Sequence, residues 1–151
     1  MATILYCEDD KDNRKVIDSA LRNNFPQHSV ISTETVRDGL EGVTGVSLHP
    51  RHMDRISLET VEQRLRSSNA NLSELGMVIT DGKLIDPFAG AGDEIIHGWD
   101  LAQILRNLGY KGKILYTGLS AVPVGKKDLF DAEISKYEGG KIVDYARMHL
   151  T

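Results

Sequence analysis

The sequence has little cysteine, no clusters of basic residues and no long hydrophobic run, and each shortage excludes a class of protein. The single cysteine, Cys7, cannot form a disulfide within the chain, and its place in an apolar run predicts a core residue. No apolar stretch has the length of a membrane-spanning helix. The amino terminus lacks the charged and apolar regions of a signal peptide. We therefore expect a cytoplasmic protein that does not associate with membranes.

The balance of charge is mildly acidic. The formal net charge is −4, from 18 basic and 22 acidic residues. Binding to nucleic acid requires clustered lysine and arginine, and Lys126-Lys127 is a pair rather than a patch, so no nucleic-acid partner is expected. With 151 residues, 40% of them hydrophobic and 26% charged, the composition predicts a single globular domain over residues 1–151.

Short apolar runs alternate with amphipathic segments along most of the chain. This alternation is typical of an α/β protein in which helices cover both faces of a parallel sheet. The predicted strands are residues 3–7, 29–33, 77–80, 113–117 and 133–135. The predicted helices are residues 12–21, 35–43, 99–108 and 140–150, with a helical turn over 125–130. The inward face of the first helix is expected to carry Val16, Ile17, Ala20 and Leu21.

Residues 44–76 lie between the second and third predicted strands and do not fit the simple alternation. Residues 45–54 have the composition of a loop, and Ser57 is placed to cap a helix over residues 57–66. An amphipathic helix must cover either the core of its own domain or a partner, and the domain's own core is favoured here. The apolar residues that share one face of this helix are Leu58, Val61 and Leu65.

Two further segments have the composition of common binding motifs. The glycine-rich residues 87–94 predict a loop, and Gly90-Ala-Gly92 lacks the Gly-Lys-Ser/Thr ending of a phosphate-binding loop. His49 and His52 have no accompanying cysteine or third ligand, so a surface loop is favoured over a metal site. Neither segment predicts a functional site.

Polar residues stand where four of the predicted strands end. Because the carboxyl ends of parallel strands share one edge of a sheet, ligands bind in the crevice there and these side chains should meet. Acids, a hydroxyl and an amine in one small pocket suit a divalent cation and a phosphoryl group. In chain order, the residues are Glu8, Asp9 and Asp10, then Asp81, Thr117 and Lys136.

The residue types of this group suggest a particular chemistry. A carboxylate attacks a phosphoryl group poorly, because like charges repel. Mg²⁺ between Asp9 and Asp81 would neutralise that repulsion, and one or two carboxylates suffice because magnesium keeps several waters. Lys136 is a compact positive charge that can follow the phosphate, and the product would be an aspartyl phosphate. Without the metal, the crowded carboxylates should raise one another's pKa.

Taken together, these features resemble the response-regulator receiver domain of two-component signalling. The resemblance spans nearly the whole chain, except residues 44–76 and part of the loop expected over residues 84–97. It implies a doubly wound, flavodoxin-like sheet of five parallel strands in the order 2-1-3-4-5, with a helical insertion between strands 2 and 3. The motifs that carry the resemblance are Ile-Leu-Tyr-Cys-Glu-Asp-Asp at residues 4–10, Val-Ile-Thr-Asp81, Gly98-Trp-Asp-Leu, Leu-Tyr-Thr117-Gly and Ile-Ser-Lys136.

The resemblance also implies partners and a role for each matching residue. A histidine kinase or a histidine phosphotransfer protein would be the partner, with Mg²⁺ as cofactor, and signalling would follow by conformational change or phosphorelay. Because the sequence ends one residue after the last predicted helix, a stand-alone receiver is expected. The implied roles are Asp81 as phosphoryl acceptor, Asp9 as a direct Mg²⁺ ligand, Glu8 as a ligand through water, the backbone carbonyl of Lys83 as a further ligand, Thr117 as a hydrogen-bond donor to the phosphoryl group and Lys136 as its ion-pair partner.

The sequence departs from the family pattern at a few positions. The family often has an aromatic switch residue three positions before the lysine, where this chain has Glu133, and Tyr116 is a candidate substitute. Tyr137 replaces the proline that usually follows the lysine; a trans bond is expected, because a cis bond before a non-proline residue costs roughly 3–4 kcal/mol. Lys83 and Leu119 occupy the positions that tune phosphoryl lifetime in the family. Neither side chain readily orients a water, which predicts slow self-dephosphorylation.

Two rival functions stand beside this one. A phosphohydrolase with an aspartate nucleophile at a strand end needs a second aspartate two residues later. Lys83 stands at that position, so an enzyme is not expected. A degenerate receiver, which binds partners without being phosphorylated, stays open because Glu133, Tyr137 and residues 44–76 depart from the family pattern.

Overall fold

The apolar runs of the sequence form one five-stranded parallel sheet. The structure is a computed structural model, and it describes residues 1–48, 57–86 and 94–150. The strands are β1 (Thr3–Cys7), β2 (Ser29–Thr33), β3 (Leu75–Thr80), β6 (Lys113–Tyr116) and β7 (Ala132–Glu133). Their order is β2-β1-β3-β6-β7 and every neighbouring pair is parallel, which confirms the predicted order 2-1-3-4-5.

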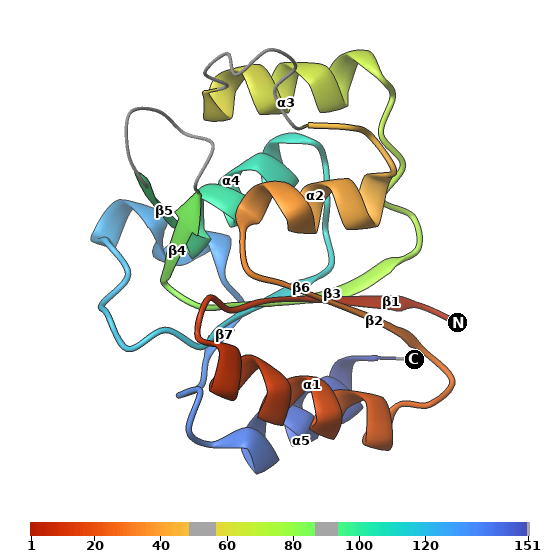
Figure 1. Cartoon of the computed structure of the whole chain (residues 1–151), viewed down its shortest axis with the longest axis vertical. Coiled ribbons are helices and arrows are strands. Elements are labelled where there is room, and N and C mark those ends of the chain that lie inside the picture. The colour runs from red at the N-terminus through yellow and green to blue at the C-terminus, as the bar shows by residue number, and fades with distance from the viewer. Residues whose placement is uncertain (49–56, 87–93, 151) are drawn as a thin grey trace.

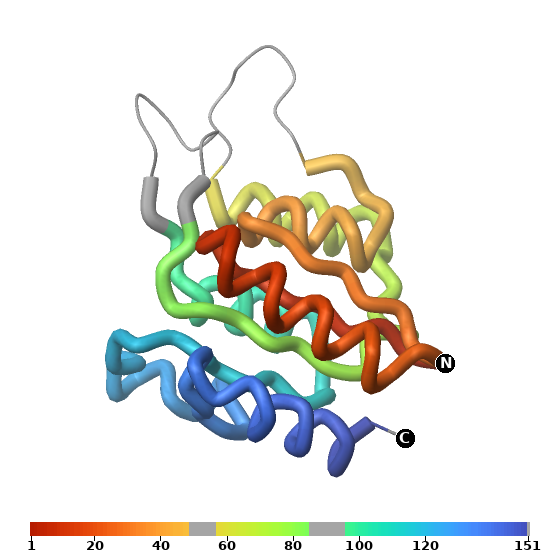
Figure 2. The backbone as a smooth tube through the Cα atoms, turned by 60° about the horizontal axis from the view of Figure 1, so that its bottom comes forward, coloured from red at the N-terminus to blue at the C-terminus, as the bar shows by residue number. Residues whose placement is uncertain are grey.

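Helices cover both faces of this sheet (Figure 1). On one face, α1 (Lys11–Asn24) and α5 (Gly139–His149) lie side by side (Figure 2). On the other face lie α2 (Val36–Thr44) and α4 (Gly98–Asn107), with α3 (Leu58–Ser67) beyond them. A short 3₁₀ helix, η2 (Val124–Leu129), connects β6 to β7. The doubly wound arrangement is therefore confirmed.

Strand residues alternate between two apolar cores, one on each face of the sheet. Ile4 and Tyr6 of β1 pack with residues of α1 and α5, whereas Leu5 and Cys7 pack with residues of α2, α3 and α4. The strand is apolar on both sides because both faces are covered. Cys7 is fully buried with its thiol 3.4 Å from the hydroxyl of Thr33, so its predicted core position is confirmed.

The first helix begins at the acidic residues that follow β1. The side chain of Asp10 caps α1 by accepting hydrogen bonds from two backbone N–H groups of the first turn. Ile17 and Leu21 are buried, but Val16 is 65% exposed, so its predicted inward position is wrong. Val16 lies about 100° around the helix from Ile17, outside the stripe that Ile17 and Leu21 define.

The helix predicted over residues 57–66 is present as α3. The hydroxyl of Ser57 caps its first turn by accepting a hydrogen bond from the backbone N–H of Thr60 at 3.2 Å. Val61 and Leu65 are buried in the core that α3 shares with α2 and α4. This helix therefore covers the core of its own domain, the alternative that the sequence favoured.

A hairpin that the sequence did not predict lies between Asp81 and α4. Its strands, β4 (Lys83–Asp86) and β5 (Glu94–His97), pair antiparallel, so the expectation of a loop over 84–97 is wrong at both ends of that segment. Leu84 and Ile96 are buried in the core. Each strand has four residues, which is too short for an alternating pattern to distinguish a strand from a loop.

The remaining expectations concern segment ends and outlying residues. Strand β3 begins two residues before the predicted strand, and β7 begins one residue before its prediction. No peptide bond among the described residues is cis, so the bond between Lys136 and Tyr137 is trans, as expected. Within the described ranges, no helix combines the length and apolarity needed to span a membrane. His49, His52 and residues 87–93 lie outside the described part of the chain.

Candidate functional site

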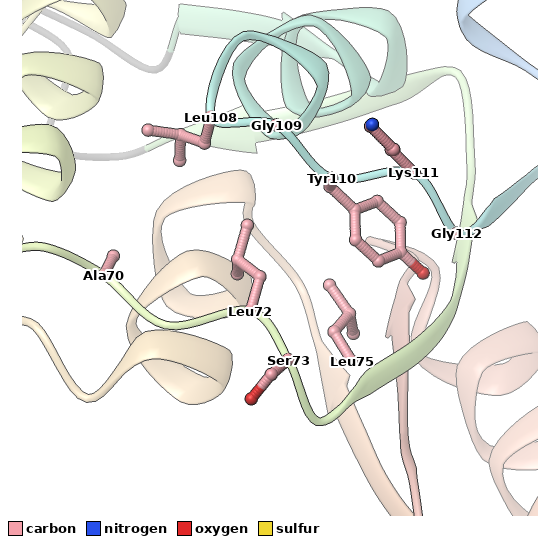
Figure 3. Close-up of a pocket in the computed structure, with 9 residues that line it drawn as sticks. All are labelled: Ala70, Leu72, Ser73, Leu75, Leu108, Gly109, Tyr110, Lys111 and Gly112. Carbon is pink, nitrogen blue, oxygen red and sulfur yellow. The ribbon is translucent and has the colours of Figure 1, made fainter.

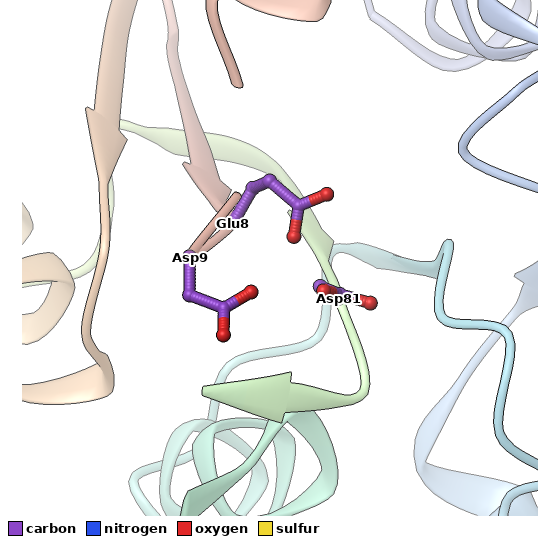
Figure 4. A group of neighbouring side chains, drawn as sticks. All are labelled: Glu8, Asp9 and Asp81. Atoms are coloured by element: carbon purple, nitrogen blue, oxygen red, sulfur yellow. The ribbon is translucent and has the colours of Figure 1, made fainter. Parts of the chain in front are cut away.

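The acidic residues that follow β1 and β3 meet at one edge of the sheet. These two strands are neighbours, with Cys7 opposite Thr80, and the Asp81 backbone N–H donates to the carbonyl of Cys7 at 2.9 Å. Glu8, Asp9 and Asp81 each place a carboxylate oxygen within 4.8 Å of the other two (Figure 4). Parallel pairing of β1 with β3 therefore brings together acids that are more than seventy positions apart in the sequence.

Lys136 joins the acids from the loop after β7. Its backbone N–H donates to the carbonyl of Thr117 at 3.2 Å, which fixes the residue beside the end of β6. Its Nζ lies 3.3 Å from Oε1 of Glu8 and 3.3 Å from Oδ2 of Asp81. The Lys136 side chain is 12% exposed and that of Glu8 is fully buried. Burial of charge is costly unless the charges are paired, so this lysine stabilises the acidic cluster in part.

Thr117 stands directly after β6, next to the strand that carries Asp81. The residue is 1% exposed. Its backbone N–H donates to the carbonyl of Thr80 at 2.9 Å, and its hydroxyl donates to the same carbonyl at 3.3 Å. The hydroxyl is therefore held at the carbonyl of the residue before Asp81. It could exchange this hydrogen bond for one to a stronger acceptor near Asp81.

The first turn of α4 packs against the backbone at Asp81. The backbone N–H of Gly98 donates to the carbonyl of Gly82 at 2.9 Å. A Cβ atom at position 98 would overlap the carbonyl oxygen of Asp81, so the close approach requires glycine here. The backbone N–H of Gly82 also donates to Oδ1 of Asp81 at 2.7 Å, which orients the carboxylate.

Burial and mutual interaction separate the pKa values of the acids. Burial, together with the neighbouring Asp81, raises the pKa of Glu8 from 4.5 to about 8, and the same two causes raise the pKa of Asp9. Burial opposes a lower pKa at Asp81, but the Glu8 carboxyl, the Gly82 N–H and the Lys136 charge outweigh it, so the pKa of Asp81 is lowered. Asp81 is thus the carboxylate that most readily stays ionised.

The cluster fits a divalent cation of the magnesium type. All three side chains offer carboxylate oxygens, which hard cations prefer. Oε1 of Glu8 is in ion-pair contact with Lys136, but neither of its two buried oxygens accepts a well-formed hydrogen bond, so this carboxylate has coordination capacity to spare. Among the described residues, Glu8, Asp9 and Asp81 are the one group of three acids, histidines or cysteines close enough to share an ion.

Other residues singled out in the sequence lie around this cluster. Lys83 is the first residue of β4, is paired with His97 and has an exposed side chain; its carbonyl as a metal ligand stays a prediction. Asp10 is exposed and caps α1 outside the group of three acids. Tyr137 is 69% exposed and Leu119 is 63% exposed. These positions are open to partners and to solvent.

Arg14 is a residue of the site that sequence reasoning missed. From the first turns of α1, it donates from Nη1 to the backbone carbonyl of Glu8 at 2.8 Å, and its Nη2 pairs with Glu34 at 2.9 Å. It therefore ties the loop after β1 to the loop after β2. The sequence carries no local signal for this contact, because Glu34 is twenty positions away and the bond to Glu8 uses the main chain.

Comparison with known proteins identifies the fold. No family model matches the sequence, and no curated protein matches it. Among solved structures, a CheY-like response regulator receiver domain protein from Methanospirillum hungatei has a TM-score of 0.62 at 15% identity, covering 98% of this chain and 92% of that chain. The chain has the fold of a response-regulator receiver domain.

Two further receiver-type structures share this fold. A chemotaxis protein from Vibrio cholerae has a TM-score of 0.60 at 12% identity and covers 99% of each chain. The receiver domain of the histidine kinase CKI1 from Arabidopsis thaliana, which was solved in complex with Mg²⁺, has a TM-score of 0.57 at 13% identity and covers 97% of this chain and 90% of that chain. At these identities the likeness shows the receiver fold, and the roles of individual residues depend on the geometry of this chain.

Proposed function

We propose that this receiver domain accepts a phosphoryl group on Asp81 from a phosphorylated histidine of a histidine kinase or a histidine phosphotransfer protein. The observation that carries the proposal is a buried Asp81 beside two further acids, with the ammonium of Lys136 3.3 Å from its Oδ2. Lys136 pairs with Glu8 and Asp81, and Asp9 adds a third carboxylate to the cluster, so the excess negative charge is destabilising unless a cation offsets it. Such a group suits a bound cation and a phosphoryl group.

The proposed transfer uses each residue in a defined way. An oxygen of Asp81 forms a bond to phosphorus as the bond from phosphorus to the histidine nitrogen breaks, and that nitrogen keeps the electron pair and takes up a proton. Asp9 and Asp81, with Glu8 acting through water, would hold Mg²⁺, and the ion would supply positive charge that offsets repulsion between carboxylate and phosphoryl oxygens. Lys136 pairs with a phosphoryl oxygen, and the hydroxyl of Thr117 leaves the Thr80 carbonyl to donate to another.

The output that we propose is a shift between two conformations, or transfer of the phosphoryl group to a further histidine. Phosphorylation favours whichever state brings Thr117 and Lys136 onto the new oxygens, and a partner that binds this state reads the signal. The protein then acts as a phosphoryl carrier and not as an enzyme that turns over a substrate. Because the ammonium of Lys83 and the aliphatic side chain of Leu119 offer no acceptor that would orient an attacking water, slow self-dephosphorylation is expected.

Acetyl phosphate with Mg²⁺ tests this proposal, with intact mass as the readout. We expect the mass gain of one phosphoryl group in the wild-type protein, its loss in Asp81→Asn, and its retention in Asp10→Asn. Asp10 is the matched control because it follows the acidic cluster directly but is exposed and caps a helix. Continuous release of free phosphate would indicate a phosphohydrolase instead, and no adduct in any variant would indicate a receiver that binds partners without phosphorylation.

A further inference from the structure

Tyr116 lies next to the residues of the proposed phosphoryl site. It is the last residue of β6, directly before Thr117, and it is 1% exposed. Its hydroxyl donates to the backbone carbonyl of Ser120 at 2.6 Å. The ring is therefore fixed at both ends, by the strand at its Cα atom and by the loop after β6 at its hydroxyl.

The hydroxyl of Tyr116 also fills the space beside two glycines of the site. A Cβ atom at Gly82 or at Gly118 would overlap this hydroxyl oxygen. Gly82 follows Asp81 and donates its N–H to that carboxylate, and Gly118 follows Thr117. One phenol is thus packed between the backbone that carries the phosphoryl acceptor and the backbone that carries the hydroxyl donor.

The same ring begins a chain of aromatic contacts that leads away from the site. Its centroid lies 5.1 Å from that of Phe130, which follows η2, and 6.5 Å from that of Trp99 in the first turn of α4. Trp99 in turn stacks on His97 at the end of β5, with centroids 4.1 Å apart and planes 10° from parallel. Phe130, Trp99 and His97 are all partly exposed, so the chain of contacts runs from the buried site to the surface.

We propose that Tyr116 is a positioning residue that couples the Asp81 and Thr117 backbones to each other and, through Trp99 and Phe130, to α4 and η2. The inference rests on the proposed function. Close-packed side chains transmit displacement, because they lack free volume to absorb it. When Thr117 moves onto a phosphoryl oxygen, the adjoining Gly118 backbone moves against the Tyr116 hydroxyl. The phenol must then shift against Trp99 or Phe130.

The emission of Trp99 reports this coupling directly, because Trp99 is the single tryptophan of the chain. We expect acetyl phosphate with Mg²⁺ to change the tryptophan emission of the wild-type protein in step with its gain in mass. In Tyr116→Leu, which removes the ring, the mass gain should persist while the emission change becomes at least about threefold smaller. Tyr145→Leu is the matched control, because Tyr145 is a half-buried tyrosine of α5 on the opposite face, and it should keep the full emission change.

A second experiment tests the packed hydroxyl without phosphorylation. Gly82→Ala should lower the melting temperature by about 3 °C or more, because its methyl group overlaps the Tyr116 hydroxyl. In the Tyr116→Phe background, measured against Tyr116→Phe alone, the same Gly82→Ala change should lower the melting temperature much less, because the oxygen that is in the way is absent. Gly125→Ala is the matched control, since a Cβ there meets nothing within 4 Å.

The two readouts separate the failure of this inference from the failure of the proposed function. A wild-type protein that gains the phosphoryl mass with unchanged emission, or a Tyr116→Leu variant with the full emission change, overturns the coupling alone. No gain in mass overturns the proposed function. In that case, a Gly82→Ala variant that melts like the wild type overturns the role of Tyr116 as well, and so does a Gly82→Ala change that lowers the melting temperature equally with and without Tyr116→Phe. A smaller loss in the Tyr116→Phe background retains Tyr116 as the link between the two backbones.

Discussion

The two ends of the sheet share the same strands and hold opposite kinds of chemistry. Where β1 and β3 end, buried carboxylates crowd around the ammonium of Lys136. Where β3 and β6 begin, a pocket of about 380 Å³ opens between the chain after α3 and the end of α4. Its walls are mostly apolar side chains and backbone, with Leu72, Leu75, Leu108 and Tyr110 as the larger side chains (Figure 3).

The proposed function places the reactive end of the molecule where charge is buried and not where the larger hollow lies. At the pocket, Lys111 makes no ion pair with any described residue and is exposed, and the buried hydroxyl of Tyr110 has no hydrogen-bond partner. The residues that line this pocket do not surround a buried charge. At the opposite end, the chain retains three acids in a place where their mutual repulsion is destabilising, and such groups cluster at functional sites.

The largest expected effect contrasts a lysine from each end. Lys136→Ala should slow phosphorylation by acetyl phosphate about a hundredfold or more, because it removes the charge that offsets the developing negative charge on the phosphoryl oxygens. Lys111→Ala, at the pocket end, should leave the rate unchanged. Rates follow from intact mass against time, and similar rates for the two variants would mean that the acidic end is not the reactive one.

Magnesium should stabilise the acidic end specifically. A ligand that binds only the folded protein, at a hundred times its dissociation constant, adds about 2.7 kcal/mol to the free energy of unfolding. We expect Mg²⁺ to raise the melting temperature of the wild type, and Asp9→Asn to reduce that increase strongly. The pocket variant Leu72→Ala should be destabilised but should respond to Mg²⁺ like the wild type. Melting curves that ignore Mg²⁺ in every variant would contradict the metal site.

The pH dependence of stability should also originate at the acidic end. The pKa of Glu8 is raised to about 8 in the folded protein from 4.5, so between these values the folded state binds more protons than the unfolded state. Without Mg²⁺, this carboxyl therefore contributes stability that falls as pH rises from 5 to 8. In Glu8→Gln that fall should shrink, as measured by melting curves over this range. Parallel pH profiles for the wild type and the variant would show that Glu8 ionises normally.

The smallest effect contrasts two buried tyrosines, one near each end. Tyr110→Phe removes a hydroxyl that has no partner and should raise the free energy of unfolding by about 1 kcal/mol. Tyr116→Phe removes a hydroxyl that donates to Ser120, and it should lower that free energy by about 1 kcal/mol. Denaturant unfolding measures both values. The same sign for the two variants would refute the assignment of their hydrogen bonds.

Much of the acidic end could be predicted from the sequence, because parallel strands covered on both faces are apolar until they stop. The apolar run of β1 ends at Glu8 and that of β3 ends at Asp81. These polar residues therefore indicate where the two strands end, at the edge of the sheet that they share. The same logic located Thr117 and Lys136. What the pattern could not supply is the distance between these groups, which depends on strand register.

The parts that the sequence did not predict depend on contacts far apart along the chain or on very short elements. The hairpin of β4 and β5 has strands of four residues around a glycine-rich segment, too short for a periodic signal. Val16 is apolar but exposed, because a helix position is decided by its angle to the core and not by its residue type alone. The bond from Arg14 to the Glu8 carbonyl involves the main chain, on which the sequence is silent.

The central claim, that Asp81 is the phosphoryl acceptor, is tested most directly by trapping the acyl phosphate. Borohydride reduces an aspartyl phosphate to homoserine, which peptide mass spectrometry locates to a single residue. After treatment with acetyl phosphate and Mg²⁺, we predict homoserine at position 81 and at no other acid, and none when Mg²⁺ is withheld. Homoserine at Glu8, Asp9 or Asp10 instead, or no reduced residue in a protein that has gained the phosphoryl mass, would contradict the account.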